Sequence, residues 1–184
     1  MSNQTLLEAV RRKRKYAGFF DWPDKRIKES AIVRLLSEGM EAKGEPGFVE
    51  VIPNEVDPPD CVGVTANGQH VGIEVTEFVD QELAERGQRL IGQHRDWTIP
   101  DVIDRIQTII DTKDLKCARP TIFPRLILLI HTDELFLRGS AGEPVLEALA
   151  VRIFHKPVHI DEVVFMVSYD PDLQTYPWVR LNLA

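Results

Sequence analysis

The chain has 184 residues, of which 43% are hydrophobic and 28% are charged, as in an ordinary globular domain with its own core. Its net charge of −7 argues against a protein covered in nucleic acid, although a local basic patch remains compatible with it. The longest apolar run, residues 126–130, is too short to cross a bilayer, and the first apolar stretch precedes its basic residues, the reverse of a signal peptide. Cys61 and Cys117 suggest neither a disulfide framework nor a metal-ligand pair, so we expect a reduced, cytoplasmic protein with no membrane partner.

The N-terminal quarter predicts two helices. Apolar residues at helical spacing indicate a first helix over residues 3–16, which ends in the basic run 11-RRKRK-15. That run is interpreted as a solvated helix end, with an arm that contacts phosphates as the alternative. A second helix is expected from Pro23 to Met40, and Glu29 borders its buried face.

Three strands follow, at residues 48–52, 60–66 and 70–79. Asn67-Gly68 predicts a hairpin between the second and third strands. We expect a tight turn that places Cys61 opposite Glu74. In that register Asp60 is one residue out of line with Glu74, so the strand must kink to bring the two acids together.

The second half of the chain alternates helices and strands. Thr98 and Asp101 form a variant capping box at the start of a helix, and residues 125–131 contain a continuous apolar run that indicates a strand buried on both faces. The order of elements predicts an α/β domain with a mixed sheet and helices on both faces. The further expected elements are helices at 81–93 and 143–153 and strands at 163–168 and 178–183.

Glu74 lies within the apolar run of its strand, with Asp60 across the hairpin. Two carboxylates at close range repel each other, so either one is protonated or a cation lies between them. Hard oxygen ligands suit Mg²⁺, and such a cation can polarise a phosphodiester and activate water. Glu29, on the second helix, is the acid that can complete the site.

These residues, Glu29 in 26-RIKESAIVRLL-36, Pro59-Asp60, and Glu74-Val75-Thr76 in 71-VGIEVTEF-78, resemble the PD-(D/E)XK nuclease superfamily. The resemblance covers roughly residues 24–168 and implies a restriction-endonuclease-like, three-layer α/β/α fold with a central mixed sheet. It also implies that Asp60 and Glu74 bind Mg²⁺ or Mn²⁺, that Glu29 assists, and that the protein hydrolyses phosphodiester bonds in nucleic acid. We expect one domain with an N-terminal helical extension (1–22), a nuclease-like core (23–168) and a C-terminal strand or tail (169–184).

Thr76 occupies the place of the motif lysine, and a threonine carries no positive charge. Its hydroxyl can still orient a water. Three outcomes stay open: another basic residue has replaced the lysine, the metal alone activates water, or the site is inactive. The basic candidates on the following helices are Arg86, Arg89, Lys113 and Lys116.

Two other interpretations remain. The chain can be a catalytically inactive member of the same fold that binds nucleic acid or another protein. It can also be an unrelated α/β protein, in which Asp60 caps a turn and Glu74 pairs with a basic group. The expected partners are nucleic acid and a second copy of the chain. No P-loop, dinucleotide fingerprint or nucleophile elbow suggests another class of enzyme.

Overall fold

The computed structural model describes residues 25–79, 97–117, 122–134, 137 and 142–184, and the helices expected at 3–16 and 81–93 lie outside these ranges. The helices are α2 (Lys25–Ala42), α4 (Ile99–Lys116) and α5 (Glu143–Val151). The strands are β1 (Glu50–Pro53), β2 (Cys61–Val64), β3 (His70–Glu77), β4 (Leu126–Thr132), β5 (Ile153–Phe154), β6 (Glu162–Val167), β7 (Trp178–Arg180) and β8 (Asn182–Leu183).

Six strands form one mixed sheet, in the order β1-β2-β3-β4-β6-β7. The β1-β2-β3 meander is antiparallel, β3, β4 and β6 run parallel, and β7 is antiparallel to β6. The mixed α/β architecture predicted from the sequence is therefore confirmed. The single strand expected at 178–183 is wrong in detail, because β7 joins the main sheet whereas β8 pairs with β5 in a separate two-stranded sheet.

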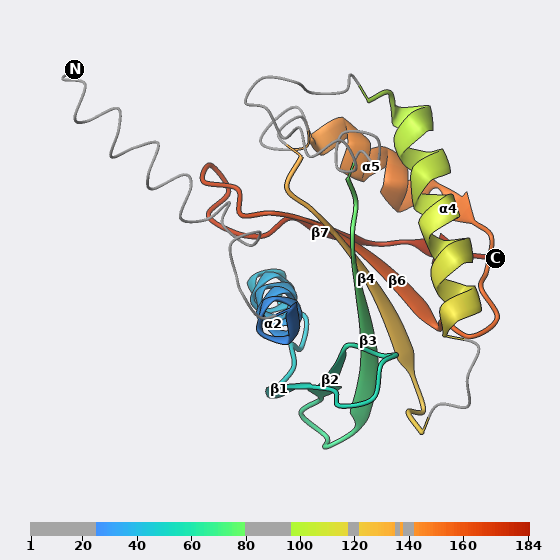
Figure 1. Ribbon diagram of the computed structural model, residues 1–184. Helices are drawn as coiled ribbons and strands as arrows, with labels where there is room; N and C mark the ends of the chain where they lie inside the picture. Colours follow the sequence, from blue (N-terminus) through green and yellow to red (C-terminus); the bar gives the residue numbers. More distant parts are fainter. Residues whose placement is uncertain (1–24, 80–96, 118–121, 135–136, 138–141) are drawn as a thin grey trace.

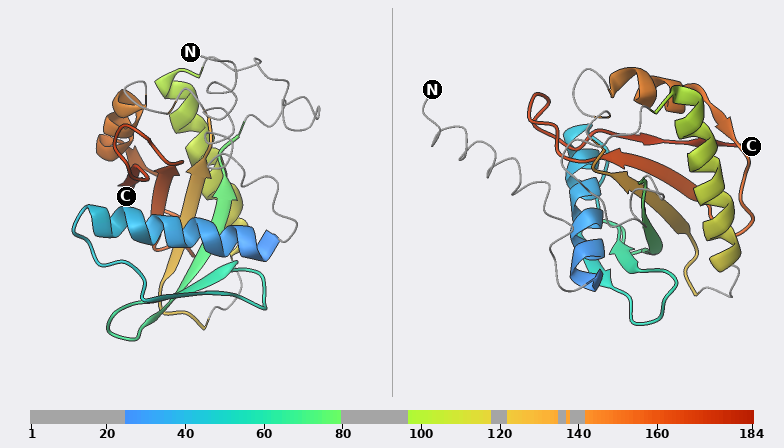
Figure 2. Two further views of the ribbon diagram at one scale, coloured as in Figure 1. Left: turned by 90° about the vertical axis from the view of Figure 1, so that its left-hand side faces the viewer. Right: turned by 45° about the horizontal axis from the view of Figure 1, so that its top comes forward.

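Helices cover both faces of the main sheet, as Figures 1 and 2 show: α2 lies across one face, and α4 and α5 lie on the other. All seven residues of β4 are buried: the apolar run that predicts a buried strand, and His131 and Thr132 after it. Its side chains alternate between two cores, with Ile127 and Leu129 packed in the cluster on the α2 side and Leu128 and Ile130 in the cluster on the α4 side. No helix in the described ranges has the length and apolarity that a membrane-spanning segment requires.

The start of α4 is fixed by the capping box that the sequence predicts. The Thr98 hydroxyl accepts a hydrogen bond from the Asp101 amide, while the Asp101 carboxylate accepts one from the Thr98 amide at 3.0 Å. The capping box thereby satisfies two of the amide groups at the helix end that lack intrahelical partners. A helix with a fixed start presents its last turn, which carries Lys113, at a fixed height along the sheet.

The register expected for the β2-β3 hairpin is wrong by one residue. Cys61 pairs with Ile73 rather than with Glu74. The connection has three residues instead of two: the Thr65 amide donates to the Gln69 carbonyl at 3.0 Å, and Gly68 adopts a left-handed conformation with φ 78°. Only glycine takes that conformation without strain. Continuing this register by one residue places Asp60 level with Glu74, so the expected kink is unnecessary.

Candidate metal centre

The candidate site lies where β2 begins and β3 continues past it. β3 pairs with β2 only over residues 70–73, whereas it pairs with β4 over residues 72–77. Beside the second half of β3, Asp60 takes the place of a strand partner, because its Oδ2 accepts a hydrogen bond from the Val75 amide at 2.8 Å. This bond holds a buried carboxylate against the edge of the sheet.

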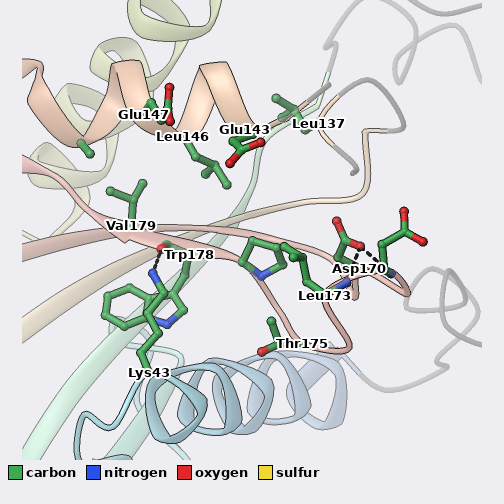
Figure 3. Close-up of a pocket in the computed structure, with 13 residues that line it drawn as sticks. Lys43, Leu137, Glu143, Leu146, Glu147, Asp170, Leu173, Thr175, Trp178 and Val179 are labelled. Carbon is green, nitrogen blue, oxygen red and sulfur yellow. Dashed lines mark hydrogen bonds between the residues drawn. The ribbon is translucent and has the colours of Figure 1, made fainter. Parts of the chain in front are cut away.

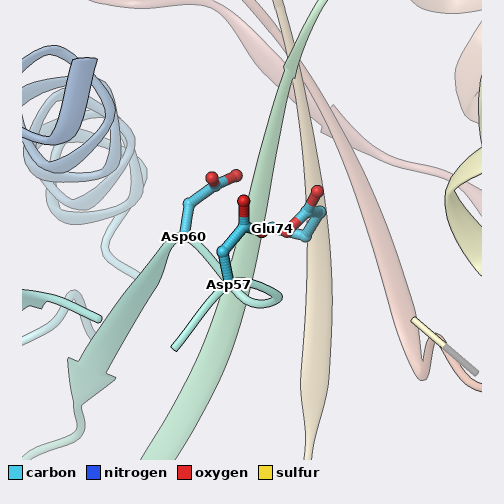
Figure 4. A group of neighbouring side chains, drawn as sticks. All are labelled: Asp57, Asp60 and Glu74. Atoms are coloured by element: carbon cyan, nitrogen blue, oxygen red, sulfur yellow. The ribbon is translucent and has the colours of Figure 1, made fainter. Parts of the chain in front are cut away.

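Three acids converge at this edge. Asp57, Asp60 and Glu74 each have a carboxylate oxygen within 4.8 Å of the others. In Figure 4, Asp57 and Asp60 extend from the loop and the start of β2 toward β3, which carries Glu74. Asp60 and Glu74 are buried, and Asp57 is exposed. Asp57 is absent from the residues predicted from the sequence, although its place in 57-DPPD-60, three residues before Asp60, was a usable signal.

Lys113 reaches the cluster from the last turn of α4. Its Nζ lies 2.6 Å from Glu74 Oε1 and 3.4 Å from the Val75 carbonyl oxygen. Of the four basic candidates predicted from the sequence, Arg86 and Arg89 lie outside the described residues, and Lys116 is exposed on the same helix. Lys113 is therefore the candidate that the structure brings to the acids.

The second oxygen of Glu74 is the unsatisfied atom of the cluster, as far as the described residues show. Glu74 Oε2 is buried, and no group among the described residues forms a hydrogen bond with it. Burial raises the pKa of Glu74, and the charge of Asp60 raises it further, whereas the ammonium of Lys113 opposes both effects. A buried carboxylate oxygen without a donor carries a desolvation cost that a cation can remove.

Glu29 joins the cluster from α2. Lys25 Nζ lies 3.1 Å from Glu29 Oε1 and 3.5 Å from Asp60 Oδ1, so one ammonium bridges the two acids. Burial and then the charge of Asp60 raise the pKa of Glu29 to about 7, against the opposing effect of Lys25. Glu29 is thus paired with a lysine, and Asp60 shares that lysine.

Thr76 lies on the same face of β3 as Glu74, two residues further along. Its side chain is half-buried, and it makes no hydrogen bond with the acids of the cluster in the described part of the chain. The motif position on β3 thus brings no positive charge to the site. The charge that reaches Glu74 comes from a different element, α4.

The donor set fits a hard divalent cation. In the described part of the chain, four carboxyl groups face two ammonium groups, and one buried oxygen of Glu74 lacks a donor. The acids are Asp57, Asp60, Glu74 and Glu29, and the bases are Lys25 and Lys113. Mg²⁺ and Mn²⁺ prefer carboxylate oxygens and retain water in their remaining positions. The arrangement can therefore hold such an ion through Asp57, Asp60 and Glu74.

Comparison with known proteins gives no relative. No family model matches the chain, and neither the curated proteins nor the solved structures contain a significant match. These comparisons neither support nor oppose the resemblance to the PD-(D/E)XK superfamily.

Proposed function

We propose that this protein hydrolyses phosphodiester bonds in nucleic acid at a divalent-metal site of the PD-(D/E)XK type, within a restriction-endonuclease-like core. The proposal depends on one observation, the convergence of Asp57, Asp60 and Glu74 at the open edge of β3, with Lys113 against Glu74. Acids that approach this closely at a sheet edge, with basic groups beside them, are typical of functional sites.

In this proposal Asp60 and Glu74 are metal ligands, and Asp57 is a third. When bound, Mg²⁺ or Mn²⁺ would act as a Lewis acid that polarises a phosphoryl oxygen. The hydrogen bond from the Val75 amide orients Asp60, and the ion pair with Lys113 orients Glu74. Both ligands are therefore preorganised, which reduces the cost of binding an ion.

Lys113 is the proposed replacement for the lysine that Thr76 displaces. Its ammonium lies beside Glu74, and it has three donors, of which one points to Glu74 and another lies near the Val75 carbonyl. The remaining donor can form a hydrogen bond with the attacking water or with a phosphoryl oxygen. An ammonium fixed where negative charge develops stabilises the transition state.

Glu29 and Lys25 are proposed to act at the mouth of the site. A carboxyl group with a pKa of about 7 can accept a proton from water near neutral pH. The Lys25 side chain is 71% exposed, so its ammonium can meet a phosphate of the substrate while it stays close to Asp60. Nucleic acid is accordingly the proposed partner, and the expected homodimer stays a prediction that light scattering can check.

The direct test is cleavage of labelled single- and double-stranded DNA and RNA in Mn²⁺ or Mg²⁺. We expect the wild-type protein to cleave at least one of these substrates, and Asp60→Asn to abolish the activity. Lys113→Met should reduce the rate by roughly 100-fold, the scale of losing one preorganised electrostatic donor. Lys116→Met, an exposed lysine on the same helix, is the matched control and should leave the rate unchanged. No metal-dependent cleavage of any substrate would reject the proposal.

A second function is favoured by the short Lys113–Glu74 contact itself. At 2.6 Å this ion pair can neutralise Glu74 without a metal, as in a structural ion pair. The protein would then be an inactive member of the fold that binds nucleic acid or another protein. Fluorescence anisotropy with labelled DNA and RNA distinguishes the two functions, because this second one requires binding that neither needs Mn²⁺ nor leads to cleavage.

A further inference from the structure

A groove of about 630 Å³ lies at the β7 edge of the main sheet. One wall is a face of α5, and the other is the chain that leads from β6 into β7, as Figure 3 shows. The strands β4 and β6 separate this edge from β3, which carries Glu74. The groove is therefore separate from the candidate metal centre.

The groove combines an apolar floor with three exposed carboxylates. Glu143 and Glu147 are one turn apart on α5, and Asp172 belongs to the opposite wall, where buried Asp170 accepts hydrogen bonds from the Asp172 and Leu173 amides. Within the described ranges, Glu143, Glu147 and Asp172 have no ion-pair partner. The apolar surface comes from Leu137, Leu146, Ala150, Leu173, Pro177, Trp178 and Val179.

Among the described residues that line the groove, Lys43 is the one basic residue. It is already engaged, because its Nζ donates a hydrogen bond to the Trp178 carbonyl at 2.6 Å and lies 4.4 Å from the centre of the indole ring. Lys43 therefore does little to neutralise the carboxylates that line the groove. A groove of this kind suits a segment that has apolar side chains on one face and several basic side chains beside them.

The chain itself contains such a segment outside the described residues. Leu6, Leu7 and Val10 are spaced to share one face of a helix, and five consecutive basic residues, 11-RRKRK-15, follow directly. The connection is long enough to reach the groove. From Lys25, where α2 begins, to Lys43, just after its end, the helix rise amounts to about 27 Å, and the nine Cα–Cα steps from residue 16 to residue 25 can span about 30 Å.

We propose that residues 3–16 dock in this groove of the same chain, with the apolar face on the floor and the basic run against the carboxylates of α5 and the opposite wall. The apolar contacts supply most of the stabilisation, and the charges fix the orientation of the segment. While it is docked, the basic run is not available to the phosphates of nucleic acid. This inference does not depend on the metal centre.

The test is disulfide trapping in the full chain, with Val10→Cys paired with Ala150→Cys, which is exposed and lines the groove. The control pairs Val10→Cys with Ile122→Cys, which is 92% exposed after α4 and does not line the groove. The native thiols do not interfere at pH 8, because burial raises the pKa of Cys61 to about 12 and that of Cys117 to about 11.

We expect the Val10–Ala150 disulfide to form within one chain at least about tenfold faster than the control disulfide, since docking raises the effective concentration of the two thiols. The charge reversals Glu143→Lys and Glu147→Lys, both at exposed positions, should remove that advantage. Equal rates for the two pairs, an advantage that survives the charge reversals, or a disulfide that forms only between two chains would each overturn the inference.

Discussion

Glu29→Gln should change how the stability of the protein depends on pH. The folded-state pKa of Glu29 is raised from 4.5 to about 7, so between these values the folded protein binds a proton that the unfolded chain has released. The free energy of unfolding of the wild type must then fall as pH rises through this window. Glutamine keeps the shape of the protonated acid but cannot ionise, so the variant should not show this loss.

The size of the effect follows from linkage. With the two pKa values above, the loss attributable to Glu29 between pH 5 and pH 8 is at most about 2.5 kcal/mol. Lys25, whose ammonium pairs with Glu29, is largely exposed, so solvent screens the charges around Glu29. We therefore expect the loss of stability to be smaller, about 1–2 kcal/mol. Urea unfolding at both pH values, at constant ionic strength and with a chelator present, measures it.

The control for this experiment is Glu38→Gln, an exposed glutamate on the same helix, which should follow the wild type at both pH values. The reasoning about Glu29 would be refuted if Glu29→Gln and the wild type lost stability in parallel from pH 5 to pH 8. It would also be refuted if the variant lost more stability than the wild type.

Three further predictions concern the site and its support. Lys113→Met leaves buried Glu74 without its cation and should lower the free energy of unfolding by about 3 kcal/mol in a urea titration, with Mn²⁺ restoring part of the loss. Asp57→Asn removes an exposed ligand, so it should weaken Mn²⁺ binding roughly tenfold by calorimetry and leave the melting temperature unchanged. Gly63→Val should lower the melting temperature in a calorimetric scan, because an added Cβ at Gly63 would lie only 2.6 Å from the ring of Phe48. The expected loss in the free energy of unfolding is about 1–3 kcal/mol, and an unchanged melting temperature would contradict this packing.

The elements that the sequence predicted well are those whose signal is local. The capping box at Thr98 and the unbroken apolar run of β4 each depend on residues within a few positions of one another. The hairpin was placed correctly, but its register was not, because Asn67-Gly68 is compatible with turns of two or three residues. In the structure Gly68 is left-handed but Asn67 is not, which is the pattern of the longer turn, and that turn moves Asp60 into line with Glu74.

The site itself was predictable only in part. The apolar setting of Glu74 and the nearby Asp60 indicated a pair of acids, and the structure brings them together. The partner of Glu74 was not predictable, because Lys113 is 39 residues away in the sequence and belongs to α4, in the helical layer that packs on the sheet. Of the two candidates among the described residues, only the packing of α4 on the sheet shows that Lys113, and not the exposed Lys116, contacts the acids.

The central claim, that these acids form a metal site, is tested most directly by isothermal titration calorimetry with Mn²⁺ and Mg²⁺. Glu74→Gln removes a buried ligand, and Glu77→Gln, on the same strand and paired with Lys28 at 3.7 Å, is the matched control. We predict saturable binding to the wild type and to Glu77→Gln, and binding weakened by roughly 100-fold or more in Glu74→Gln. Equal binding by all three proteins, or no binding to the wild type, would contradict the claim.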